Sequence, residues 1–257
     1  TRLAMTLAVP CLIFTALMQA KVDPQALTTQ LSASFVAHAG VALIGWLVLM
    51  ALGMSLRTFL APIIFGNTWN LGLPLALFAF GQAGLELALV ILALGAVLSF
   101  SFGIWLVAGK GSFGKILKEP MIWATLLGAL FLWQGWKTPT FLTNTLSLAG
   151  QMAIPLMLIT LGVAVARLTP GSILRAVGIS VLKLVVCVAV GWTVGLAFGL
   201  TGTAFGVLVL QTATPVAVTS YMLAEKYGAD SDAVAGLVVV STLISVAALP
   251  LLLAALL

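Results

Sequence analysis

Long apolar runs dominate this sequence and limit what it can fold into. Runs of about 18 or more apolar residues are long enough to cross a bilayer as helices. Of the 257 residues, 62% are hydrophobic and 7% are charged, whereas a soluble domain has roughly a quarter of its residues charged. The sequence therefore predicts an all-α polytopic membrane protein whose surroundings are the lipid bilayer.

Nine runs qualify as transmembrane helices, and short polar connectors separate them. The longest polar connector is GKGSFGKILKEP at 109–120. Cys11 and Cys187 lie within apolar runs, so we expect two small hydrophobic residues rather than a disulfide. The opening run, which starts at Thr1, lacks a cleavage site of small residues, so no secretory signal is predicted. The predicted spans are residues 3–20, 34–56, 58–80, 82–108, 120–136, 141–166, 173–200, 203–227 and 232–257.

Basic residues predict the orientation of these spans. If the spans alternate, eight of the 11 basic residues gather on one side, two lie on the other, and Lys183 lies within a span. Lysine and arginine concentrate in the cytoplasm, so loop 109–119 is predicted to be cytoplasmic and the C-terminus extracellular or periplasmic, in the inner (cell) membrane. The net charge of +5 then reports topology and requires no nucleic acid partner. The larger group is Arg2, Arg57, Lys110, Lys115, Lys118, Arg167, Arg175 and Lys226, and the smaller is Lys21 and Lys137.

The two halves of the chain resemble each other at an offset of about 145 residues. GWLVLMALG at 45–53 aligns with GWTVGLAFG at 191–199, and TLAVPCLIFT, which contains Pro10, aligns with QMAIPLMLIT, which contains Pro155. The second half has an extra leading span, so we expect the first of ten helices to be absent from this chain. Five helices per half predict an inverted repeat, with the first repeat at 1–108, the loop at 109–119 and the second repeat at 120–257.

The same alignment places GNTWNLGLP at 66–74 over LQTATPVAV at 210–218. Each stretch interrupts an apolar span with polar residues and a proline. Backbone groups freed in this way are tolerated only where they are buried in protein or line a wet cavity, and half-helix ends can hold a carboxylate or a cation. We therefore expect two broken helices to cross and bind a small organic anion. The candidate binding residues are Asn67, Thr68, Asn70, Gly72, Pro74, Gln211, Thr212, Thr214 and Pro215.

Three ionisable residues are weaker candidates. Lys183 lies about ten residues into its span, where it could counter an anion or replace a coupling cation; the alternative is a lysine that reaches the headgroups along its own stem. Glu86 is a candidate for proton coupling or a solvated helix end. His38, about one turn into its predicted span, is a titrating switch or an interfacial residue. No metal site or cofactor is predicted, apart from H⁺ or Na⁺ as a coupling ion.

Several stretches resemble the auxin efflux carrier family and its bacterial members. They are GNTWNLGLPLAL, AIPLMLITLGVAVARL, KEPMIWATLLG and TPVAVTSYMLAEKYGADSDAVAGLVVVSTLISVAALPLLL. The resemblance covers essentially the whole chain from the family's second helix onward. It implies a ten-helix fold like those of the sodium/proton antiporters and bile acid symporters. It also implies transport of small organic anions: auxin in plants, dicarboxylates such as malonate or malate in bacteria.

The resemblance also implies that the spans form two domains with different roles. A scaffold at 3–20 and 120–166 carries the dimer contact, which makes a homodimer an expectation, and a transport domain at 34–108 and 173–257 moves against it. Asn67 matches the family's crossover asparagine, and Pro74 and Pro215 match its crossover prolines. Val216 stands where plant members carry an amide, so the polar role passes to Gln211 or Thr214, and auxin itself is not the expected substrate.

The sequence therefore predicts a secondary active or facilitative transporter of small organic anions that works by elevator-type alternating access. A cation (Na⁺/H⁺) antiporter or a bile-acid-type Na⁺ symporter of the same fold is the alternative. A channel also stays open, because broken helices can form filters. An enzyme is not predicted: the aspartates lie near span ends, and neither an in-span serine and histidine pair nor an HExxH motif is present.

Overall fold

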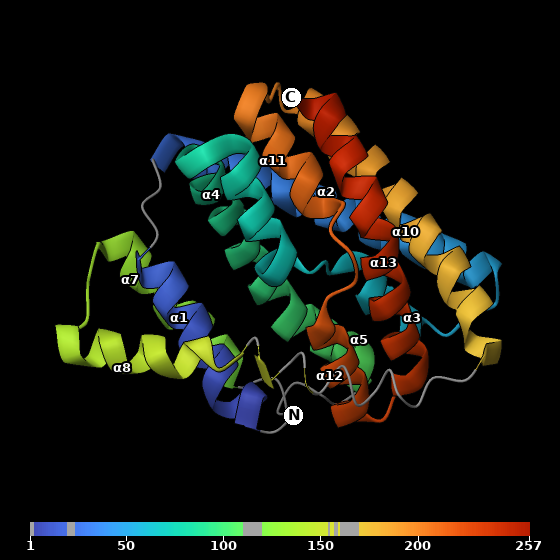
Figure 1. Ribbon diagram of the computed structural model, residues 1–257, viewed down its shortest axis with the longest axis horizontal. Helices are drawn as coiled ribbons and strands as arrows, with labels where there is room; N and C mark the ends of the chain where they lie inside the picture. The colour runs from blue at the N-terminus through green and yellow to red at the C-terminus, as the bar shows by residue number, and fades with distance from the viewer. Residues whose placement is uncertain (1–2, 20–23, 110–119, 154, 157–158, 160–169) are drawn as a thin grey trace.

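The computed structural model is built of helices and their connectors (Figure 1). Four stretches of the described residues are long and apolar enough to cross a bilayer: Thr28–Ala51, Thr68–Ala108, Ile173–Ala197 and Ser231–Leu256. Shorter apolar helices accompany them. The chain is an all-helical, multi-pass membrane protein, as predicted, while the count of nine spans and the inverted repeat stay predictions. The structure describes residues 3–19, 24–109, 120–153, 155–156, 159 and 170–257.

One group of helices lies at the left of Figure 1, and its members pack on one another. Helix α8 approaches α1 closely at Gly150, where a Cβ atom would lie 2.9 Å from the Cα of Leu12. The rings of Phe14 and Phe131 meet edge to face, with centroids 5.2 Å apart. These are the predicted scaffold spans, although part of 141–166 lies outside the described residues. The group consists of η1 (Ala4–Ala8), α1 (Val9–Gln19), α7 (Pro120–Gln134) and α8 (Thr140–Gln151).

The remaining helices form a larger bundle on the other side of Figure 1. Helix α4 contacts both α1 and α7 and so joins the two groups. The predicted loop 109–119 is, apart from Gly109, outside the described residues. The bundle consists of α2 (Pro24–Ala51), α3 (Leu56–Ile64), η2 (Thr68–Gly72), α4 (Leu73–Leu98), η3 (Ser99–Gly103), α5 (Ile104–Ala108), α10 (Pro170–Ala197), α11 (Gly202–Thr212), α12 (Val218–Tyr227) and α13 (Ser231–Leu256).

Glycine and aspartate set two of the predicted helix boundaries. Gly81, between the predicted spans 58–80 and 82–108, has φ 65° and ψ −157°, a conformation open chiefly to glycine. Gly228 ends α12 in the left-handed region with φ 69°, which is a common helix terminus. Asp230 then caps α13, since its side chain accepts a hydrogen bond from the N–H of Ala233 at 3.0 Å. The structure confirms the boundary at Gly228 and shows a kink within α4 at Gly81.

The predicted start of the span at 34–56 is wrong. Helix α2 already begins at Pro24 and ends at Ala51, so it is 28 residues long. A proline is tolerated in the first turn because its missing N–H has no helical partner there. Several residues in the first turns of α2 are polar, so hydropathy alone places the start of this span too late. As a result His38 lies in the middle of α2, and its predicted place one turn from a helix end is also wrong.

Candidate functional site

The two interrupted helices cross, and their unwound segments pair side by side through one antiparallel β-bridge. Gly66 and Val216 form an antiparallel bridge. The N–H of Asn67 donates to the carbonyl of Pro215 at 2.7 Å, and the N–H of Ala217 donates to the carbonyl of Phe65 at 3.2 Å. Each break thus satisfies backbone groups that the other leaves free, as buried groups in a membrane require. We call residues 65–67 and 213–217 the crossover.

Two glycines allow these segments to approach. A Cβ atom at Gly66 would lie 2.1 Å from Oγ1 of Thr214 and 3.2 Å from its carbonyl oxygen. A Cβ atom at Gly72 would lie 2.1 Å from Oε1 of Gln211. A larger residue at position 66 would press on both the side chain and the backbone of Thr214, whereas at position 72 it would displace the flexible end of the Gln211 side chain. Both glycines of GNTWNLGLP thus lie against the other broken helix, and Gly66 is the one that the packing requires.

We expect Gly66→Ala to lower the stability of the folded protein by about 1–3 kcal/mol, the usual cost of overpacking a tight contact. Thermal unfolding in detergent measures the change. Gly178→Ala on α10 is the matched control, because no described atom beyond its own stretch of helix lies within 4 Å of the added Cβ. If both variants melt at the same temperature, the close approach at the crossover is not what requires Gly66.

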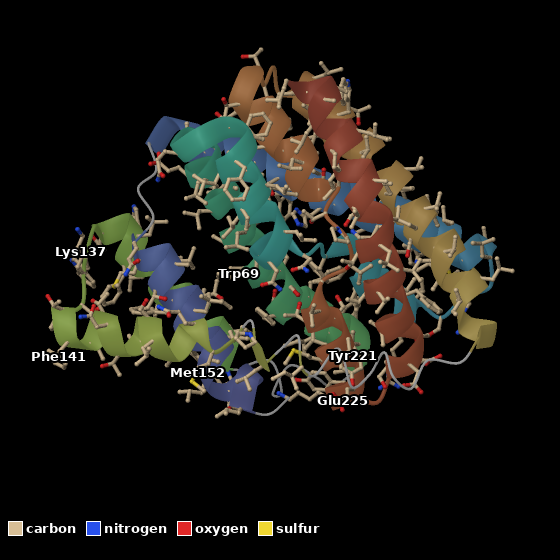
Figure 2. The ribbon with its side chains drawn as sticks, in the orientation of Figure 1. Trp69, Lys137, Phe141, Met152, Tyr221 and Glu225 are labelled. Atoms are coloured by element: carbon tan, nitrogen blue, oxygen red, sulfur yellow. The ribbon has the colours of Figure 1, made fainter. Side chains whose placement is uncertain are left out.

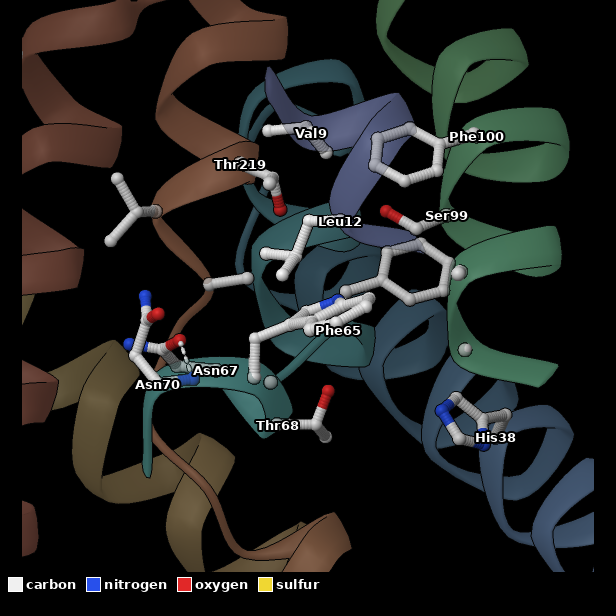
Figure 3. A pocket seen from close by; sticks show the side chains of 16 residues that line it. Val9, Leu12, His38, Phe65, Asn67, Thr68, Asn70, Ser99, Phe100 and Thr219 are labelled. Carbon is white, nitrogen blue, oxygen red and sulfur yellow. Dashed lines mark hydrogen bonds between the residues drawn. The ribbon is translucent and has the colours of Figure 1, made fainter. Parts of the chain in front are cut away.

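A pocket lies between the crossover and α1, and Figure 3 shows its walls. Its volume is about 40 Å³. Most of the wall is apolar, with polar side chains placed at a few points, as is typical of small-molecule sites. We call it the crossover pocket. Its labelled residues in Figure 3 are Val9, Leu12, His38, Phe65, Asn67, Thr68, Asn70, Ser99, Phe100 and Thr219.

Asn67 sits where the crossover leads into η2. Its Oδ1 accepts a hydrogen bond from the N–H of Asn70 at 3.4 Å and so caps the turn. The side chain is 9% exposed and lines the crossover pocket. Oδ1 of Asn70 is buried without a protein partner in the described part of the chain. Both amides therefore bring polar atoms to a site that is otherwise mostly apolar.

A second, smaller pocket lies among α2, α10, α11 and the start of η2, and we call it the Gln211 pocket. His38, Thr68, Cys187, Gln211 and Thr212 are among its lining residues. The side chain of Gln211 is 1% exposed, yet neither its Oε1 nor its Nε2 has a hydrogen-bond partner among the described residues. Leaving a buried amide unpaired costs roughly 1–3 kcal/mol per group. Gln211 is thus available to a water molecule or a bound solute.

Lys183 does not extend toward the headgroups. Its side chain is 2% exposed, and Nζ donates to the carbonyl of Ile63 at 3.1 Å. In an unbroken helix that carbonyl would accept from the N–H of Asn67, which is bonded instead to Pro215. Lys183 therefore satisfies a carbonyl that the break in α3 leaves free. It also places a positive charge beside the crossover.

The structure gathers most of the candidate residues and leaves two outside. Thr214 and Pro215 line a third small pocket together with Lys183, and the hydroxyl of Thr214 donates to the carbonyl of Gln211 at 2.7 Å. Pro74 is exposed in the first turn of α4. Glu86 lies beyond the Gly81 kink and lines none of the three pockets described here.

Three residues of the crossover pocket were missed or underrated from sequence. His38 was placed near the membrane surface because the start of α2 was misjudged. Ser99 and Thr219 lie in apolar runs beside other hydroxyl residues, and no motif or spacing distinguishes them from hydroxyls that bond to their own helix. Their positions follow from how α4, η3 and α12 fold around the crossover.

Comparison with known proteins finds transporters. A family profile described as "Membrane transport protein" matches residues 112–253. An uncharacterized transporter of Methanothermobacter thermautotrophicus is 31% identical over 199 residues, which is 72% of this chain and 63% of the relative. A second one, of Methanocaldococcus jannaschii, is 25% identical over 190 residues, or 70% of this chain and 62% of the relative. The chain thus spans less than two thirds of the length of these relatives.

Proposed function

The chain belongs to the membrane transport protein family, the auxin efflux carriers, and from this premise we propose that it carries small organic anions across the membrane. The crossover pocket is the proposed binding site. Its polar atoms come from Asn67, Thr68 and Asn70, with Ser99 and Thr219 opposite them. Such neutral donors can replace the water around a carboxylate without binding it irreversibly.

Charge is the observation that supports an anion over a cation. Lys183 is the buried charged side chain among the described residues, and it lies beside the crossover. The described carboxylates, Glu86, Glu225, Asp230 and Asp232, line none of the three pockets around it. Hard cations are bound by several oxygen ligands, commonly carboxylates. A site that has a positive charge nearby and no described carboxylate in its wall suits an anion better than Na⁺.

The size of the pocket supports a short substrate. A volume of about 40 Å³ is room for roughly three water molecules at about 10–15 Å³ each. Malonate or malate therefore suits the site better than a bicyclic indole acid. The rings of Phe65 and Phe100 and the side chain of Leu12 would cover the carbon chain.

The position of the pocket supports alternating access. Val9 and Leu12, on α1, come from the predicted scaffold, while the other walls come from the predicted transport domain. Figure 2 shows Trp69, another wall residue, in the middle of the molecule between these helix groups. A substrate held at this boundary changes sides if one group slides along the other, as in an elevator-type carrier. A homodimer through the predicted scaffold and a cytoplasmic 109–119 loop are parts of the same proposal.

Counterflow in liposomes tests this function. Vesicles loaded with unlabelled malonate should take up labelled malonate, with a rate that saturates and without a Na⁺ gradient. Vesicles without protein are the control. If malonate, malate and other short carboxylates do not exchange while Na⁺ or H⁺ does, the protein is a cation antiporter of the same fold. Flux that fails to saturate would indicate a channel.

A further inference from the structure

His38 is the titratable side chain that lines both the crossover pocket and the Gln211 pocket. Its ring lies on α2 and faces α4, with Nε2 3.7 Å from the position a Cβ would take at Gly95. The centroid of the Phe65 ring lies 6.3 Å from that of the imidazole. Figure 3 shows the ring at the edge of the site, below Ser99 and across from Thr68.

The backbone contact of the ring fixes its tautomer. Nδ1 lies 2.8 Å from the carbonyl oxygen of Ser34. A carbonyl can only accept a hydrogen bond, so Nδ1 carries the proton. The hydroxyl of Ser34, at 3.4 Å from Nδ1, is the longer contact and does not change this assignment. The neutral imidazole therefore turns an unprotonated Nε2 with a lone pair toward the site.

A lone pair at Nε2 repels a carboxylate, so the neutral ring and the proposed substrate do not fit together. An imidazolium fits, since Nε2–H would donate a charge-assisted hydrogen bond to a carboxylate oxygen. In the empty site nothing described holds that proton in place. Two titratable groups on α10 lie on this side of the ring: Cys187 lines the Gln211 pocket with His38, and Nζ of Lys183 lies 3.7 Å from the Sγ of Cys187. A positive charge on Lys183 opposes a second one on the ring.

The other elements around the ring bring no ionisable side chain within the described residues. Helix α3 and the crossover contribute Ile64, Phe65 and Gly66, η2 contributes Thr68, and α4 with η3 contributes Gly95 and Ser99. Helix α11 contributes Gln211 and Thr212. The negative charge that would stabilise an imidazolium must therefore come from the bound anion itself.

We propose that His38 takes up a proton as a carboxylate enters the crossover pocket, so that one proton crosses the membrane with each anion. This inference rests on the proposed function and adds the coupling ion. Nε2 takes a proton from water, and the resulting N–H donates to the carboxylate. On the other side of the membrane the anion leaves, the imidazolium loses its proton to water, and the neutral carrier returns.

Nitrogen NMR of the protein labelled with ¹⁵N-histidine tests the proton directly, because the sequence contains a single histidine. The protein is purified without a histidine tag. Without ligand, the spectrum should show the neutral ring protonated at Nδ1. Saturating malonate at the same pH should convert it to the imidazolium, whereas dimethyl malonate, which has no carboxylate, should not. A ring that starts as the Nε2–H tautomer, or stays neutral when malonate binds, overturns the inference.

Proton movement in liposomes provides the second test. A pH dye inside the vesicles should report about one proton per malonate during net uptake, as the proposed cycle requires. His38→Gln should lower the flux, and the flux that remains should carry no proton, because an amide donates without titrating. If wild-type protein exchanges malonate in counterflow but moves no proton, the inference fails while the proposed function stands. If counterflow itself is absent, the proposed function fails first.

Discussion

Asn67→Asp is expected to abolish anion transport while the protein stays folded. An aspartate has nearly the same shape and can still accept the hydrogen bond from the N–H of Asn70 that caps η2. It adds a negative charge to the wall of the crossover pocket. Two like charges about 4 Å apart repel by about 4 kcal/mol at an effective dielectric constant of about 20, which is roughly a thousandfold loss of affinity.

Malonate counterflow and thermal unfolding measure the two halves of this prediction. Asn144→Asp, at an exposed position on α8, is the matched control and should leave both unchanged. Asn67→Ala should lower transport less than the aspartate does, since it removes a donor without adding charge. Retained malonate exchange in Asn67→Asp, or new Na⁺ transport by it, would favour the cation carrier over the anion carrier.

Lys183→Met is expected to reduce malonate uptake at least tenfold. At an effective dielectric constant of about 20, a unit charge about 10 Å away still attracts an anion by about 1.7 kcal/mol, slightly more than a tenfold change in affinity. The methionine leaves the carbonyl of Ile63 with only the weak thiol donor of Cys187, at 3.8 Å, but it also removes the cost of burying an ammonium group. These effects on stability oppose each other, so transport should fall more clearly than the unfolding temperature.

Lys137→Met is the control for this substitution, because Lys137 is exposed and lies at the outer end of the α7 and α8 group (Figure 2). It should transport malonate like the wild type. If Lys183→Met keeps its malonate affinity but becomes dependent on Na⁺, Lys183 stands in for a coupling cation and does not attract the substrate. If it fails to fold, Lys183 is needed chiefly for the carbonyl at the end of α3.

The breaks in the helices could be predicted because glycine and proline have local effects that the sequence displays. Gly66 and Pro215 each interrupt an apolar run, and the structure pairs the two segments through their backbones. Gly81 marked a boundary between spans for the same reason. The prediction from hydropathy was wrong at the start of α2, because polar residues follow Pro24 although the helix is continuous there.

The remaining site residues could not be predicted because their roles depend on how helices pack. The sequence placed Lys183 inside a span, but its side chain could point either into the protein or toward the lipid headgroups. The free carbonyl of Ile63 decides between them, and that carbonyl is free because the crossover takes its usual partner. His38 similarly enters the site because α2 runs past the crossover, which no local pattern reveals.

Binding of a small carboxylate at the crossover is the central claim, and an anomalous scattering map with bromomalonate tests it most directly. Bromomalonate should first compete with malonate in counterflow. A bromine peak in the crossover pocket, within contact distance of Asn67 and Thr68, is the predicted result. A crossover pocket without a bromine peak under the same saturating conditions would contradict the claim. So would a peak confined to the separate cavity in the α1, α7 and α8 group, whose lining includes Met18, Phe131 and Lys137.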